Sequence, residues 1–137
     1  MRKNRPHPTY FTDEAGCRLV RLPVSGSDTP AITQAALYDK ATLHHELTGN
    51  IYMSFDSKGH GYPTASIPNS GTHKHLARLL LDCPRGFHVR YIDGDSLNLL
   101  PENFRLASTR VAPDVCAEVL ARLLDAARAE EAVDEAA

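Results

Sequence analysis

The chain has 137 residues, of which 42% are hydrophobic and 23% are charged, and its formal net charge is −2. This length fits one domain, and the composition excludes a collagen-like, coiled-coil or wholly disordered chain. The charge is unevenly distributed, with 13 basic against 10 acidic residues over 1–110 and 2 against 7 over 111–137. A basic body with an acidic end can mark nucleic-acid contact by the body.

No apolar run approaches the roughly 18–20 residues of a membrane span. Residues 1–8 also lack the apolar stretch of a signal peptide. We therefore expect a cytoplasmic protein without membrane contact. Three cysteines, Cys17, Cys83 and Cys116, are widely spaced and odd in number. They argue against a disulfide framework and favour small, buried, reduced thiols.

The first half of the chain predicts a mobile arm and then a small antiparallel sheet. Residues 1–16 are polar and basic, contain Pro6, Pro8 and Gly16, and show no period, which indicates a flexible basic arm. Residues 17–24 are strand-like and are followed by a turn and a second short apolar piece at Ala31-Ile32. The antiparallel sheet begins here.

A helix is predicted between residues 33 and 47, where Ala36, Leu37, Leu43 and Leu47 repeat at loosely helical spacing. Residues 51–55 and 62–67 are β-prone and flank a segment with the composition of a hairpin loop, so we expect them to pair antiparallel. The predicted sheet extends over 17–67.

A second helix is predicted over about 73–82, with Thr72 as its cap. Its apolar residues Leu76, Leu79, Leu80 and Cys83 stand at i, i+3, i+4 and i+7.

The last third predicts a β-hairpin followed by a helix. Residues 87–92 and 104–107 are strand-like and are separated by the turn Asp93-Gly94-Asp95. An amphipathic helix follows from Pro113 and has an acidic end. The fold class is therefore α+β, with an arm (1–16), a domain (17–110) and a C-terminal helix (111–137).

Residues 79–108 contain a Pro84-Arg85-Gly86 turn, the Gly94-Asp95 turn and the segment Glu102-Asn103-Phe104-Arg105-Leu106-Ala107. In residue types and mutual spacing this stretch resembles the HNH (His-Me finger) endonuclease domain of phage and homing-nuclease type. Upstream, the paired strands and Gly61-Tyr62 are similar to the AP2-like sheet of that family. The resemblance implies a ββα unit, two strands and a helix that cradle a divalent metal, and a phage or prophage origin.

In that family an Asp binds the metal, the next His is the general base, a central Asn orients the His and a helix residue completes the site. The resemblance puts Arg90 and Tyr91 at the Asp-His pair, Asn103 at the central Asn and Ala112 at the helix ligand. Arg90 is a fixed cation where a metal belongs, Tyr91 is a poor base at neutral pH, and Ala112 has no ligand atom. The resemblance therefore implies a degenerate, catalytically inactive site, in which the Asn103 amide ties the loop to the strand.

Rebuilding a metal site from nearby histidines is not favoured. His73 and His75 stand at i, i+2, which does not place them on one face of the predicted helix, and His44 and His45 are adjacent. A structural zinc site needs four convergent ligands, and no Cys-x-x-Cys or His-x-x-x-His spacing is present. We expect no metal or other cofactor.

The leading hypothesis is a pseudoenzyme that binds double-stranded DNA, because replacing Asp by Arg removes a metal ligand and adds a phosphate-binding cation. The candidate DNA contacts are basic residues of the region that resembles the nuclease: Lys58, Lys74, Arg78, Arg85, Arg90 and Arg105.

Two alternatives stay open. The first is a protein-interaction module that binds a host or phage protein or forms a homodimer through the C-terminal helix. Val115, Val119 and Leu123 would dock there, although such a face ordinarily packs on the domain's own core. The second is an active metal-dependent HNH endonuclease with an unusual centre.

Overall fold

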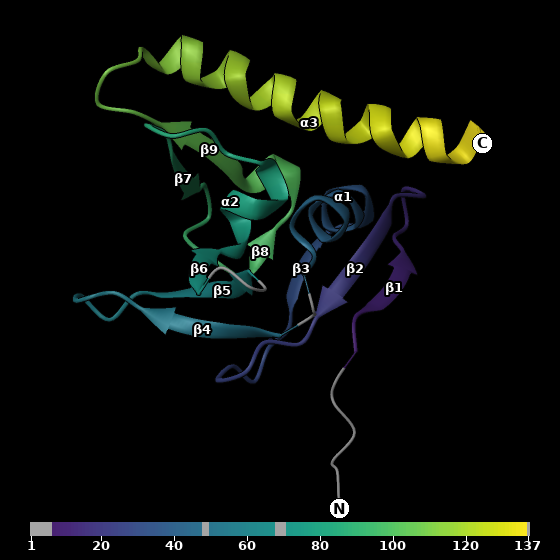
Figure 1. The fold of residues 1–137 in the computed structure, drawn as a ribbon, viewed down its shortest axis with the longest axis horizontal. Helices are drawn as coiled ribbons and strands as arrows, with labels where there is room; N and C mark the ends of the chain where they lie inside the picture. Colours follow the sequence, from purple (N-terminus) through teal and green to yellow (C-terminus); the bar gives the residue numbers. More distant parts are fainter. Residues whose placement is uncertain (1–6, 48–49, 68–70, 137) are drawn as a thin grey trace, which may run out of the picture.

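The computed structural model describes residues 7–47, 50–67 and 71–136, with backbone alone over 130–136. This part of the chain has the predicted mixed α+β architecture (Figure 1). The strands are β1 (Thr9–Thr12), β2 (Arg18–Leu22), β3 (Ala31–Gln34), β4 (Ile51–Phe55), β5 (Gly61–Ile67), β6 (Thr72–His75), β7 (His88–Tyr91), β8 (Asn98–Leu99) and β9 (Phe104–Ala107). The helices are α1 (Ala35–His45), α2 (Leu76–Leu81) and α3 (Pro113–Ala136), with a 3-10 turn at Pro101–Asn103.

The first sheet has the strand order β1-β2-β3-β8. Its first three strands are antiparallel, whereas β8 pairs with β3 in parallel, with Ile32 opposite Asn98. Val20, Leu22 and Leu99 are fully buried. Because α1 packs against β2 and β3, it covers this apolar face.

The second sheet has the order β4-β5-β6 and is antiparallel throughout. Ile51 of β4 lies opposite Ala65 of β5, and both side chains are buried in the core. The predicted pairing of residues 51–55 with 62–67 is confirmed. The other face of this sheet carries aromatic and histidine side chains, described below.

The core is centred on the short helix α2, in which five of six side chains are buried: Leu76, Ala77, Leu79, Leu80 and Leu81. The long helix α3 runs along one side of the molecule, over β9 and α1 (Figure 1). Its Cys116 and Ala127 are buried. Within the described ranges, no helix combines the length and the apolar character needed to cross a membrane.

The predicted arm contains a strand. Thr9–Thr12 form β1, which pairs with β2 at the edge of the first sheet. The Tyr10 hydroxyl donates to Asp39 Oδ1 at 2.6 Å, and the Arg21 guanidinium lies 4.0 Å from the centre of the Phe11 ring. Residues 1–6 of the predicted arm lie outside the described residues. The strand was missed because most of its side chains are exposed and give no apolar alternation.

The predicted helix over 73–82 begins too early. Thr72–His75 form the edge strand β6, so Thr72 does not cap α2, which starts at Leu76 without a side-chain cap. The backbone N–H and C=O groups of this segment form hydrogen bonds with β5, so the segment does not need a helix to pair them. The apolar positions Leu76, Leu79 and Leu80 are buried as the spacing predicted.

Two smaller expectations also differ. The predicted sheet over 17–67 is two sheets, because α1 intervenes and only a bridge between Ser25 and Tyr52 joins the first loop to β4. Of the three cysteines expected to be buried, Cys17 is exposed, Cys83 is half-buried and Cys116 is buried, and all are free thiols.

Candidate functional site

The predicted hairpin and helix form a ββα unit. β7 and β9 are antiparallel neighbours, with His88 opposite Ala107, Arg90 opposite Arg105 and Tyr91 opposite Phe104. α3 follows and packs against β9. Phe104 and Leu106 point into the core, and alternate residues therefore point outward. The packing of Phe104 and Leu106 into the core fixes the position of the hairpin.

Arg90 and Arg105 occupy the outer face of this hairpin. Both side chains are exposed and they are direct cross-strand partners. In the part of the chain that the structure describes, neither forms an ion pair, so Arg90 is not held by the nearby Asp93, Asp95 or Glu102. Like charges directly opposite each other in a sheet are destabilising. An anion bound between them would remove this repulsion.

Tyr91, which the sequence resemblance would place at the general-base position, faces inward. Its ring centre lies 6.2 Å from that of Tyr62 and 6.4 Å from that of Phe104. Burial, and then the charge of Tyr62, raises the pKa of the Tyr91 hydroxyl further above its ordinary value of 10.0. A phenol of this kind stays protonated at neutral pH and is a packing residue here.

Asn103 organises the turn between the two strands. Its Oδ1 accepts a hydrogen bond from the Asp93 amide at 2.9 Å, and its Nδ2 donates to Asp93 Oδ1 at 2.8 Å and to the Asn98 carbonyl at 2.9 Å. The side chain is buried. The predicted structural role, in which this amide ties the loop to the strand, is confirmed. Ala112, which the sequence resemblance would place at the helix-ligand position, is exposed, and its carbonyl accepts a hydrogen bond from the Cys116 amide at the start of α3.

Hydrogen bonds to the turn also affect Asp93. The Asn98 amide, the Asp95 backbone and the Asn103 amide lower the pKa of the Asp93 carboxyl from its ordinary 3.8. All three groups donate hydrogen bonds to the Asp93 carboxylate oxygens, so this carboxylate stabilises the turn.

The basic residues predicted to contact DNA have different environments. Lys58, Lys74, Arg85, Arg90 and Arg105 are exposed. Arg78 is not: its guanidinium donates to the Phe87 carbonyl at 2.6 Å and to the Pro84 carbonyl at 3.3 Å. This side chain closes the turn between α2 and β7. Among the six candidate contacts, Arg78 is therefore the one that is half-buried and held by backbone carbonyls.

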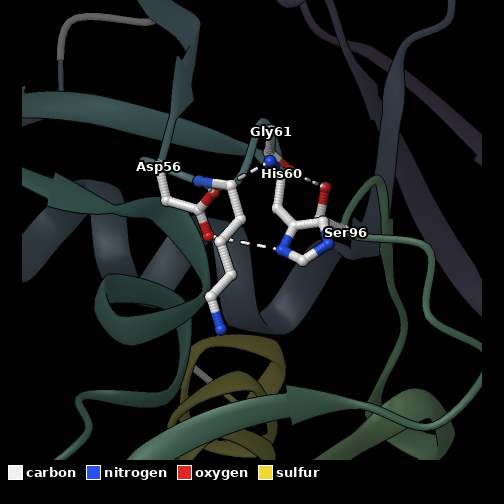
Figure 2. Close-up of polar contacts among 5 residues, drawn as sticks. Asp56, His60, Gly61 and Ser96 are labelled. Carbon is white, nitrogen blue, oxygen red and sulfur yellow. Dashed lines mark hydrogen bonds and ion pairs between the residues drawn. The ribbon is translucent and has the colours of Figure 1, made fainter.

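Lys58 lies exposed in the β4–β5 loop. A contact between Gly61 and Ser96 joins the end of this loop to the turn after β7 (Figure 2). Asp56 Oδ1 accepts from the amides of Lys58 and His60 at 2.9 Å, and Asp56 Oδ2 lies 3.4 Å from His60 Nδ1. These backbone hydrogen bonds, that from His60 first, lower the pKa of Asp56. The Ser96 hydroxyl donates to the Gly61 carbonyl at 2.6 Å. The Ser96 proton is thus used in a structural contact and not in a nucleophile–base pair with His60.

Sequence reasoning missed an aromatic and histidine face on the second sheet. His73 and His75 were expected not to share a face, but in strand β6 the i, i+2 spacing puts them on one face. The rings of His75 and Tyr62 stack at 4.8 Å, and the Tyr52 hydroxyl lies 2.7 Å from His73 Nδ1.

This face continues to the hairpin through Tyr62, which contacts both His75 and Tyr91. Although His75 as a whole is exposed, its ring is stacked on Tyr62, and the partial loss of water around the imidazole, followed by the charge of Arg78, lowers the pKa of His75 from its ordinary 6.5. The sheet and the ββα unit therefore meet at one ring cluster.

Potential metal ligands do not cluster in the described ranges, where no group of three or more His, Cys, Asp or Glu side chains is arranged to hold a metal ion. His44 and His45 end α1, and His45 Nε2 lies 3.7 Å from Asp82 Oδ1. That pair joins the ends of α1 and α2.

Comparison with models of protein families, with curated proteins and with solved structures finds no match to this chain.

Proposed function

We propose that this protein is a catalytically inactive relative of the HNH endonucleases, of phage or prophage character, that binds double-stranded DNA. The observation that carries the proposal is the exposed pair Arg90 and Arg105, directly opposite each other and without acidic partners in the described part of the chain. Phosphate is the anion that such a pair of guanidinium groups binds well.

The residues at the family's catalytic positions support the absence of cleavage. Arg90 is a cation where the metal ligand belongs, and the Tyr91 phenol, packed against Tyr62 and Phe104, is a poor base. Asn103 uses its amide to hold the turn. Ala112 offers only a methyl group.

Lys58 and Lys74 are further exposed cations, and Lys74 points to the opposite face of β6 from His73 and His75. Lys58 lies in the loop that contacts the β7 turn through Gly61 and Ser96. Contacts of this kind to the phosphate backbone give affinity that is independent of sequence and sensitive to salt.

Binding of a labelled duplex, measured by fluorescence anisotropy across a salt series, tests the proposal. We expect the double variant Arg90→Glu, Arg105→Glu to bind more weakly and to lower the magnitude of the salt slope by about 2, one for each phosphate that is no longer neutralised. A matched control reverses two arginines of α3, Arg122→Glu and Arg128→Glu. Equal, weak binding by wild type and both variants contradicts the proposal and favours a protein-interaction module.

Plasmid nicking tests the absence of catalysis. We expect no nicking with Mg²⁺, Mn²⁺ or Zn²⁺. Nicking that rises with protein concentration and disappears in Asn103→Ala would show an active centre, provided that Asn103→Ala remains folded.

A further inference from the structure

An open apolar groove with a volume of about 580 Å³ lies between β9 and α3. The helix contributes Ala117, Leu120, Ala121 and Leu124, which stand at i, i+3, i+4 and i+7 and so form one stripe. None of these four side chains is fully buried. Ala117 and Ala121 are exposed, whereas Leu120 and Leu124 are half-buried and pack against the core, so part of the stripe stays open on the surface.

The shape of the groove suits a second helix. Ala117 and Ala121 are exposed and lie one turn apart, so a partner helix can approach the backbone of α3 closely at this point. The partner's larger side chains can then pack beside Leu120 and Leu124.

The charges around the groove are complementary but do not meet within one chain. Arg105 lines the groove on the β9 side. On α3, Asp114 follows the groove-lining residue Pro113, and Glu118 follows the groove-lining residue Ala117. One position is a rotation of about 100° around the helix, so both carboxylates lie beside the groove. Both are exposed, and in the described part of the chain neither forms an ion pair. A second copy of α3 would bring these carboxylates to the unpaired guanidinium.

We infer that the groove is a homodimer interface, in which α3 of a second copy occupies it. Since α3 is itself one wall of the groove, a two-fold arrangement fills both grooves at once, as an isologous interface requires. The dimer buries Leu120 and Leu124 of both copies, and the acidic side of each α3 lies toward Arg105 of the other.

One consequence rests on the proposed function, although the dimer itself does not. Arg105 belongs both to the groove and to the proposed DNA surface, so a second copy and a duplex exclude each other there. The acidic helix would take the place of the phosphate backbone.

Sedimentation velocity over a concentration series, without DNA, tests the interface. We expect the wild type to form a dimer that dissociates on dilution. Ala121→Glu should raise the dimer dissociation constant by about tenfold or more, because it buries an unpaired carboxylate among apolar side chains. Ala126→Glu is the matched control: this alanine is exposed on the same helix but does not line the groove, and its variant should dimerise like the wild type.

Circular dichroism must show the same helix content for both variants. If Ala121→Glu unfolds, Ala117→Glu replaces it, since that side chain is also exposed in the groove. A monomeric wild type at every concentration overturns the inference, and so does a dimer that the groove variants leave unchanged or that Ala126→Glu weakens equally. Because DNA is absent, these outcomes are distinguishable from a failure of the proposed DNA binding.

Discussion

Asn103 and Asp93 are joined by two hydrogen bonds: the Asp93 backbone amide donates to Asn103 Oδ1 at 2.9 Å, and Asn103 Nδ2 donates to Asp93 Oδ1 at 2.8 Å. The same Asn103 side chain reaches the Asn98 carbonyl. The turn that joins β7 to β8 is therefore closed around one buried amide.

Replacing Asn103 by Ala should destabilise the fold by about 2–4 kcal/mol, because three hydrogen bonds are removed and the Asp93 amide is left without its acceptor. Urea denaturation followed by circular dichroism measures the change. Asn50→Ala is the control, since Asn50 is exposed, and its effect should stay within about 0.5 kcal/mol. An equal loss of stability in both variants would contradict the structural role of Asn103.

Arg78 should behave as a structural residue and not as a DNA contact. Arg78→Lys keeps the positive charge but cannot reproduce the forked hydrogen bonds to the Phe87 and Pro84 carbonyls. We expect a decrease of roughly 1–3 kcal/mol in the free energy of unfolding, with duplex affinity unchanged below the melting range. Arg85→Lys, at an exposed site in the same turn, is the control and should change neither quantity. Weaker DNA binding without a decrease in stability in Arg78→Lys would reverse this assignment.

His75 should make stability depend on pH in a mildly acidic window. Its pKa in the folded protein lies below the ordinary 6.5, because burial and Arg78 disfavour the imidazolium. The unfolded chain therefore binds the proton first, and stability falls as the pH drops from above 6.5 toward the lowered folded value.

His75→Gln should flatten this part of the stability profile, whereas His88→Gln, at an exposed position of β7, should leave it in place. Thermal unfolding at a series of pH values checks the difference. The opposite slope, with stability rising on acidification and this rise absent in His75→Gln, would mean that the folded state favours the imidazolium.

The local parts of this fold were predictable from local patterns. The turn residues around Gly94, which has φ of +79°, and the apolar alternation of Phe104 and Leu106 predicted the hairpin. The edge strands β1 and β6 were missed because most or all of their side chains are exposed, so burial imposes no alternation on the sequence. The aromatic face was missed with β6.

Long-range relationships had no sequence signal of their own. The partners of Arg78 are backbone carbonyls, which any sequence offers, so its basic side chain was interpreted as a surface charge. The groove depends on how far α3 stands from β9, which the amphipathic pattern of the helix does not specify. The strand over residues 87–92 was predictable, but the exposure of Arg90 and its lack of an acidic partner among the described residues required the structure.

The parallel pairing of β8 with β3 has a consequence for how the protein is made. β3 is complete once residue 34 has been synthesised, yet its neighbour, residues 98–99, is synthesised more than sixty residues later. Throughout that interval on the ribosome, the nascent first sheet exposes an unpaired edge next to apolar side chains, where β-rich chains aggregate most readily. This edge is closed only when residues 98–99 pair with β3.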